Sequence, residues 1–360
     1  MELTKSASFA RTIPKLGSFL PPMLGSAVSR YVNPSDVALY FRMAKDDTFV
    51  DRMFQTDQGP SFPTHLFIMA DTPAPTATSD SFASPNPGGL GNASSTTAGT
   101  APAGEVITLI LPGGRESSVQ YVGFEHPSLE ALSDKQGVSW RYYTPSAGFS
   151  QTRANSICRL RFRPDRSRNV VLQLPIFFQG DTPRQLAAAI IRTGQAFNHS
   201  ERSNGSGPSW VASLANAMGN SVYCHNIVIF IITWDKRGSW YDYVAPKTHH
   251  SYEYGFRVPL MAVSPHAKPS YVSDVTDDFG RMLRFVEQLL TLPSPGDSDA
   301  RADNINECFG CNQTPADVSY HFGAGGRTSH FLGTIVHPSI LMVEQSDRAV
   351  SVQVKSCESC

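Results

Sequence analysis

Apolar residues along the chain fall into short runs and helical repeats that alternate. The near-continuous apolar run from Ile227 to Trp234 predicts a strand buried on both faces. Residues 24–70 are expected to be largely helical. Further strands are expected at 106–111, 138–143, 170–174 and 260–263, and further helices at 127–136, 182–191, 210–218 and 277–290. This alternation predicts an α/β fold in which a mainly parallel sheet is covered by helices on both faces.

Two segments depart from the alternating pattern. Residues 71–104 consist mostly of Thr, Ser, Ala, Pro and Gly, which bury too little surface to offset chain entropy, and predict a flexible loop within the domain. Residues 316–360 contain three short apolar runs that predict strands, at 331–336, 340–343 and 350–354. We therefore expect one α/β domain over residues 1–315 and a divergent extension over residues 316–360.

Composition excludes several classes of protein. With 30 Lys and Arg against 31 Asp and Glu, the chain has no net field that would favour nucleic acid. No apolar stretch approaches the roughly 18 residues that a membrane-spanning helix needs. The first 23 residues contain cations and apolar side chains, but Pro14, Pro21 and Pro22 interrupt them, so no signal peptide is expected. The chain as given is therefore expected to stay inside the cell, unless its natural start lies further upstream.

Two positions are candidates for chemistry on local grounds. Asp235 directly follows the buried apolar run, at the strand end where α/β proteins bind ligands, and a carboxylate there can ligate a metal or orient a phosphate-binding group. Ser61 precedes a helix that is expected to begin at Pro63, so its hydroxyl lies near free backbone N–H groups that favour a phosphate oxygen. A plain helix N-cap is the alternative interpretation of Ser61.

Several phrases, in a fixed order, resemble the phosphoesterase family that contains bacterial acid phosphatases and phospholipases C, distant relatives of alkaline phosphatase. The central phrases are TWDKRGSWYDYV (233–244), GFRVP (255–259) and SPHAK (264–268). The others are FVDRMFQTDQGPSFPTH (49–65), GVSWRYYTP (137–145), GPSWVASLANAMGNS (207–221), LRFVEQ (283–288) and SDARADNI (298–305). The resemblance implies an alkaline-phosphatase-like α/β/α sandwich that hydrolyses phosphate esters, with phospholipid head groups or phosphomonoesters as substrates.

The resemblance also implies roles for individual residues. It makes Ser61 the nucleophile that takes up the phosphoryl group, and His199 a donor or general acid facing the phosphate. A solvated loop histidine is the alternative for His199. Asp242 is expected to orient the turn after the central strand, and Arg257 to pin that loop.

The family holds a divalent metal ion with a Glu-Asn pair near the N-terminus and two consecutive acidic residues at the end of the central strand. This sequence has no Glu-Asn dipeptide, and Lys236 replaces the acidic partner of Asp235. One carboxylate is too few for a hard cation, which needs several oxygen ligands. Two hypotheses therefore remain open. Either Lys236 binds phosphate directly with its ammonium group, or the chain is an inactive, truncated relative that retains only phosphate or head-group binding, or only the scaffold.

The cysteines offer one further candidate site. Cys308 and Cys311 form one C-x-x-C pair, and Cys357 and Cys360 form a second. Four thiolates of this kind can hold zinc, but the pairs are separated by far more residues than in usual zinc sites. Free thiols in an intracellular chain and a disulfide clip are the alternatives.

Overall fold

The computed structural model of the chain describes the helices, strands and connections over most of its middle part. Its described residues are 34–57, 61–76, 78–83, 105–107, 109–117, 120–122, 127–143, 170–171, 188–192, 206–220, 224, 228–235, 242–246, 248–249, 252–296, 298–310, 312–320 and 339–344.

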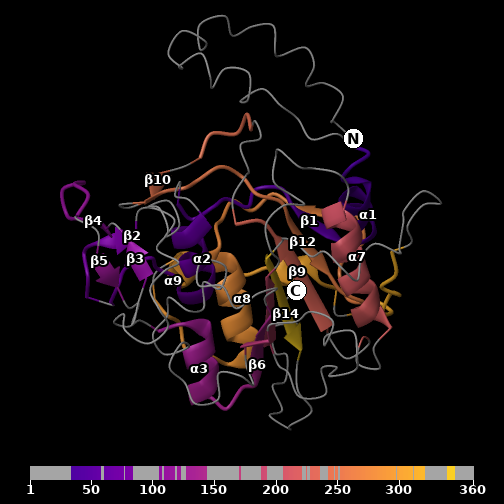
Figure 1. The fold of residues 1–360 in the computed structure, drawn as a ribbon. Helices are drawn as coiled ribbons and strands as arrows, with labels where there is room; N and C mark the ends of the chain where they lie inside the picture. The colour runs from indigo at the N-terminus through magenta and orange to yellow at the C-terminus, as the bar shows by residue number, and fades with distance from the viewer. Residues whose placement is uncertain are drawn as a thin grey trace, which may run out of the picture.

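A sheet of eight strands forms the centre of the molecule (Figure 1). In spatial order these strands are β13 (Tyr271–Ser273), β1 (Thr48–Val50), β12 (Leu260–Val263), β9 (Val228–Thr233), β14 (Ser339–Glu344), β8 (Ala188–Arg192), β6 (Trp140–Tyr143) and β7 (Val170–Val171). Three two-stranded ribbons accompany it: β2 (Phe82–Ala83) with β4 (Leu109–Ile110), β3 (Glu105–Ile107) with β5 (Gln120–Val122), and β10 (Thr248–His249) with β11 (Tyr252–Glu253).

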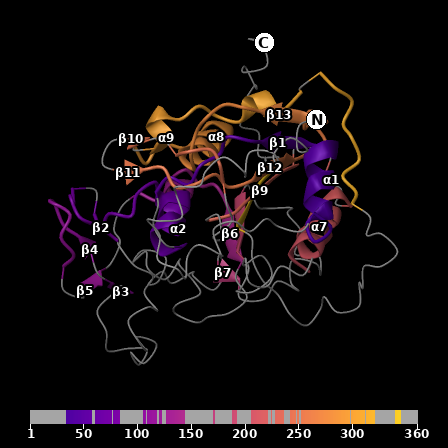
Figure 2. The same ribbon diagram turned by 90° about the horizontal axis from the view of Figure 1, so that it is seen from above.

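Helices cover both faces of the sheet, as Figure 2 shows from above. Packed on one face are α2 (Ser61–Ala70), α3 (Leu129–Lys135) and α8 (Gly280–Leu290), and on the other are α1 (Ala38–Asp46) and α7 (Ser206–Gly219). The short helices α9 (Ser298–Arg301) and η6 (Asn306–Cys308) follow α8.

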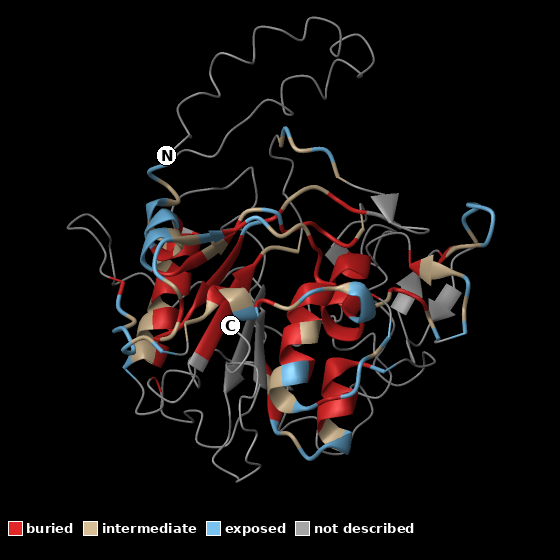
Figure 3. Ribbon diagram, turned by 180° about the vertical axis from the view of Figure 1, so that it is seen from behind, coloured by how far each residue is buried: buried red, intermediate tan, exposed pale blue. Residues whose placement is uncertain are grey.

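The central strand β9 shows why the sequence folds into three layers. Its side chains alternate between two apolar cores: Ile229 and Ile231 pack with α2 and α8, whereas Phe230 and Ile232 pack with α1 and α7. All four are almost completely buried, and Figure 3 shows the same burial in β12 and in much of the helices packed against the sheet. The predicted α/β fold, with a central strand buried on both faces, is confirmed.

The sheet is mixed, which corrects the prediction that it is mainly parallel. β12 and β14 each run antiparallel to β9, and β8 runs antiparallel to β14, whereas β6 is parallel to β7 and β8, and β1 is parallel to β13. Apolar runs alone do not encode strand direction, because a strand buried on both faces looks the same in either orientation.

Three other local predictions differ from the structure. The prediction of a helix at 182–191 is wrong for its last four residues, because residues 188–192 form β8. The β-branched Ile190 and Ile191 of this strand pair with β6 and β14. The largely helical region expected at 24–70 contains β1 between α1 and α2. The loop expected at 71–104 includes β2, while residues 84–104 lie outside the described part.

Residues 339–344 of the expected C-terminal extension form β14, which lies between β9 and β8 in the middle of the sheet. The strand expected at 340–343 is thus confirmed, whereas those at 331–336 and 350–354 lie outside the described residues. The division at residue 315 stays a prediction, although β14 belongs to the same sheet as the preceding strands.

In the part of the chain that the structure describes, no helix combines the length and apolarity needed to cross a bilayer.

Candidate functional site

The candidate site lies at the edge of the sheet where β9 ends. Thr233, the last residue of β9, pairs with Leu260 at the start of β12 and with Ser339 at the start of β14. Val50 at the end of β1 pairs with the same Leu260, and Arg192 at the end of β8 pairs with the same Ser339. The residues that follow β1 and β9 therefore emerge at one edge, beside the backbone of Arg192.

Helix α2 begins at this edge. Its apolar residues Phe62, Leu66 and Phe67 are fully buried in the core beside β9, which fixes the helix on the sheet. The Thr64 hydroxyl donates to Asp57 Oδ1 at 3.1 Å and ties the first turn to the preceding loop. Pro63 suits this first turn, because it lacks the N–H that would have no partner within the helix.

The contact between His65 and Asp235 joins α2 to the end of β9. His65 is 4% exposed, and its Nδ1 lies 3.7 Å from Asp235 Oδ2. The Asp235 side chain is 24% exposed, so its carboxylate is partly open to solvent. Ser61 is the first residue of α2, one helical turn before His65. The structure thus brings together the two elements that carry the predicted residues Ser61 and Asp235.

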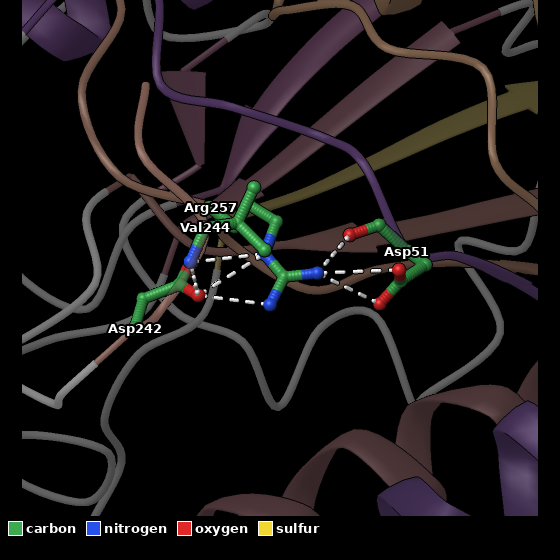
Figure 4. Close-up of polar contacts among 4 residues, drawn as sticks. All are labelled: Asp51, Asp242, Val244 and Arg257. Carbon is green, nitrogen blue, oxygen red and sulfur yellow. Dashed lines mark hydrogen bonds and ion pairs between the residues drawn. The ribbon is translucent and has the colours of Figure 1, made fainter. Parts of the chain in front are cut away.

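A three-residue ion-pair network holds the chain that follows Asp235 (Figure 4). The Arg257 guanidinium donates through Nε and Nη2 to the Asp242 carboxylate, at 2.8 to 3.3 Å, and through Nη1 to Asp51 Oδ1 at 3.1 Å. Burial opposes the charge on Arg257, but hydrogen bonds to Asp242 and the charges of Asp242 and Asp51 outweigh it and raise its pKa. Asp242 Oδ1 also accepts from the Val244 N–H at 3.0 Å, as the predicted role in the turn requires. The expectation that Arg257 pins this loop is confirmed.

We expect Arg257→Lys to lower the free energy of unfolding by about 1–2 kcal/mol, because an ammonium group cannot pair with two carboxylates through a rigid fork. Urea denaturation measures the loss. Arg42→Lys is the matched control: its pair with Asp46 is exposed on both sides and is expected to contribute roughly 0.5 kcal/mol or less. Equal losses in the two variants would contradict a structural role for the Arg257 network.

The other two predicted site residues, His199 and Lys236, lie outside the described residues, so their roles stay predictions. His65 is the residue that sequence reasoning missed. It ends the phrase GPSFPTH and follows Ser61 by four residues. In a helix this spacing places both residues on one side, which could have identified His65 as a candidate site residue. Arg192 was also missed as a residue of this edge, because its segment was expected to be helical.

The described residues do not fit the metal site that the resemblance implies. Asp235 faces an imidazole, and no group of three or more His, Cys, Asp or Glu side chains in the described part of the chain is arranged to hold a metal ion. Asp235 and His65 together offer two ligand side chains, fewer than a hard divalent cation requires from a protein site.

The predicted cysteine site is only partly described. Cys308 is a buried free thiol, and burial, followed by the charge of Glu307, raises its pKa to about 12. The thiol is therefore protonated at neutral pH, whereas zinc binds the thiolate. Cys311, Cys357 and Cys360 lie outside the described residues, so the zinc and disulfide alternatives stay untested.

Comparison with known proteins gives one assignment. No curated protein matches the chain. The model of the Phosphoesterase family matches residues 15–293, which is most of the chain and includes β1, α2, β9 and β12. This match confirms the resemblance that the ordered sequence phrases indicate. The chain therefore belongs to the phosphoesterase family.

Proposed function

We propose that this phosphoesterase hydrolyses phosphate esters with Ser61 as the nucleophile. The observation that supports this best is the 3.7 Å contact of Asp235 with His65, because it places the end of the central strand beside the helix that Ser61 begins. Membership of the family makes phosphate esters the substrate class. We further propose an alkaline-phosphatase-like sandwich and an acid-phosphatase or phospholipase C specificity.

The position of Ser61 suits phosphate chemistry. The first backbone N–H groups of a helix have no partners within the helix, and the helix dipole adds partial positive charge at the same end. A phosphate bound at the start of α2 would receive these N–H groups as donors. Lys236, the residue after Asp235, and Arg192, whose backbone lies two strands away, are the cationic residues proposed to neutralise its remaining charge.

The reaction proceeds in two displacements. The Ser61 oxygen forms a bond to phosphorus while the bond from phosphorus to the ester oxygen breaks, and the departing oxygen takes up a proton. A water oxygen then bonds to phosphorus while the bond from phosphorus to the serine oxygen breaks, so that phosphate is released and the serine oxygen takes up a proton in place of the one it lost. No step is assigned to a metal ion, because the described residues do not form a site for one.

The test is turnover of p-nitrophenyl phosphate, a monoester, and p-nitrophenyl phosphorylcholine, a diester that resembles a phospholipid head group. We expect Ser61→Ala to lower kcat by about 10³-fold or more on the preferred substrate, since it removes the nucleophile. Acid-quenched labelling with ³²P is expected to give a phosphoenzyme in the wild-type protein but none in Ser61→Ala.

Equal background rates of substrate turnover for the wild-type protein and Ser61→Ala would refute the proposal that the protein is an enzyme. Thermal stabilisation by inorganic phosphate without turnover would instead support the alternative, an inactive relative that still binds phosphate or a head group.

A further inference from the structure

The partner of Asp235 raises a question that the family pattern does not answer. A serine hydroxyl is a weak nucleophile, and it needs either a metal ion or a base to accept its proton. The described residues do not form a metal site, yet the carboxylate at the end of β9 is in contact with a histidine. This disagreement with the expected metal site points to a different way of activating Ser61.

The geometry of α2 places that histidine over the start of the helix. Side chains of helical residues lean toward the helix N-terminus, so the side chain at position i covers the turn that begins at i−4. For His65 that turn begins with Ser61. We therefore expect the imidazole to cover the turn that begins with Ser61, while its Nδ1 contacts the carboxylate of Asp235.

The surroundings of His65 hold it in this place. The flanking Phe62, Leu66 and Phe67 are fully buried, and Thr64 is fixed to Asp57 by a hydrogen bond. A base whose helix is locked into the core loses little freedom when the substrate binds, and such preorganisation favours proton transfer.

We propose that His65 is the general base for Ser61, and that Asp235 positions the imidazole through Nδ1 instead of ligating a metal ion. The inference rests on the proposed function. As the Ser61 oxygen bonds to phosphorus, its proton passes to His65 Nε2, while the departing ester oxygen on the opposite side of phosphorus takes up a proton from solvent. In the second displacement the attacking water gives up a proton to solvent, and the imidazolium returns its proton to the Ser61 oxygen as the bond from that oxygen to phosphorus breaks. Asp235 keeps its negative charge throughout and stabilises the imidazolium.

The kinetic test compares His65→Ala with the wild-type protein on the substrate that Ser61 turns over. We expect kcat to fall by about 10²–10⁴-fold with KM changed less than about threefold, and added imidazole to restore part of kcat. The chelator EDTA is expected to leave wild-type turnover unchanged. His266→Ala is the matched control, because His266 follows the opposite end of β12; we expect neither a loss of turnover nor a response to imidazole.

A second measurement reports on Asp235 without depending on turnover. In ¹⁵N NMR spectra of the wild-type protein, Nδ1 of His65 is expected to be protonated, because it faces a carboxylate. Asp235→Asn is expected to change this signal and to lower kcat while KM stays nearly constant. His65→Gln replaces His65→Ala if the smaller side chain prevents folding.

The outcomes separate this inference from the proposed function. Turnover that is lost in Ser61→Ala but retained within twofold in His65→Ala overturns the role of His65 and leaves the nucleophile in place. Loss of wild-type turnover in EDTA, or a wild-type NMR signal with Nδ1 unprotonated and unaffected by Asp235→Asn, overturns the role of Asp235. A wild-type protein with no turnover that depends on Ser61 overturns both proposals.

Discussion

Replacing Glu307 with alanine should lower the free energy of unfolding by about 3–5 kcal/mol, because it leaves the buried cation of Arg281 without its counter-ion. Arg281 lies in α8 and is completely buried. Its Nη2 pairs with Glu307 of η6, and its Nε donates to the Asn304 carbonyl at 3.0 Å. Glu307 also accepts from the Ser273 hydroxyl at 2.7 Å, so one carboxylate joins α8, η6 and the edge strand β13.

Urea denaturation of three variants tests this prediction. Arg281→Met alone removes the buried charge itself, so that no buried cation is left unpaired. It should lower the free energy of unfolding less than Glu307→Ala does. The double variant with both Glu307→Ala and Arg281→Met should recover much of the stability that Glu307→Ala loses, because no buried charge remains unpaired. If the two single losses simply add in the double variant, the pair is not energetically coupled and the prediction is wrong.

Stability should fall as pH rises from about 5 to 9, and Glu287 should be the largest single cause. Glu287 of α8 is 3% exposed, and burial, followed by the charge of Asp299, raises its pKa to about 8. Hydrogen bonding with neighbouring side chains, Asp71 first among them, lowers the pKa of Asp299 despite its burial. The proton therefore resides on Glu287.

The direction of this change in stability with pH follows from the number of protons bound in the folded and in the unfolded state. Between its ordinary pKa of 4.5 and about 8, Glu287 holds a proton in the folded protein but has lost it in the unfolded chain. The folded state therefore loses stability as pH rises through this interval, by an amount on the order of 3 kcal/mol. The buried carboxyls of Glu130 and Asp278, whose pKa values burial raises to about 7, act in the same direction.

Glu287→Gln provides the test, since an amide is uncharged at every pH and has no charge to bury. We expect the variant to match the wild-type protein near pH 5 and to exceed its stability above pH 8, as measured by urea denaturation across the pH range. Glu116→Gln, on an exposed loop, is the control and should leave the profile unchanged. A wild-type profile that does not fall between pH 5 and 9 would contradict the raised pKa of Glu287.

Much of the fold could be predicted because its main elements have strong local patterns. The run that forms β9 and the four-residue strand β12 were predicted almost to their ends, and so were α3 and α8, whereas α7 begins four residues before its predicted start at 210. β8 was not, because Ala188 to Arg192 suits a helix as well as a strand, and only pairing with β6 and β14 decides between them. β14 could be predicted as a strand, but its place beside β9 depends on contacts far apart in the sequence.

The candidate site divides in the same way. Asp235 and Ser61 were predicted from a strand end, a helix start and a family resemblance. His65 was missed because its partner is 170 positions away, and a lone histidine in an apolar helix gives no sign of such a contact. Arg281 and Glu287 were not singled out from the sequence, because the burial that makes them important comes from η6 and α9, which follow later in the chain.

By itself the sequence determined the family, the α/β class and the two elements that meet at the site, because these depend on local apolar patterns and on ordered phrases that survive in a single chain. The tertiary structure alone decided the strand directions, the partner of Asp235 and the buried charges of α8. Each of these depends on which distant segments pack together, and hydrogen bonding, burial and electrostatic pairing act through space with no trace in residue spacing. Asp235 lies where the sequence predicted, at the end of a buried strand, but its observed neighbour is His65.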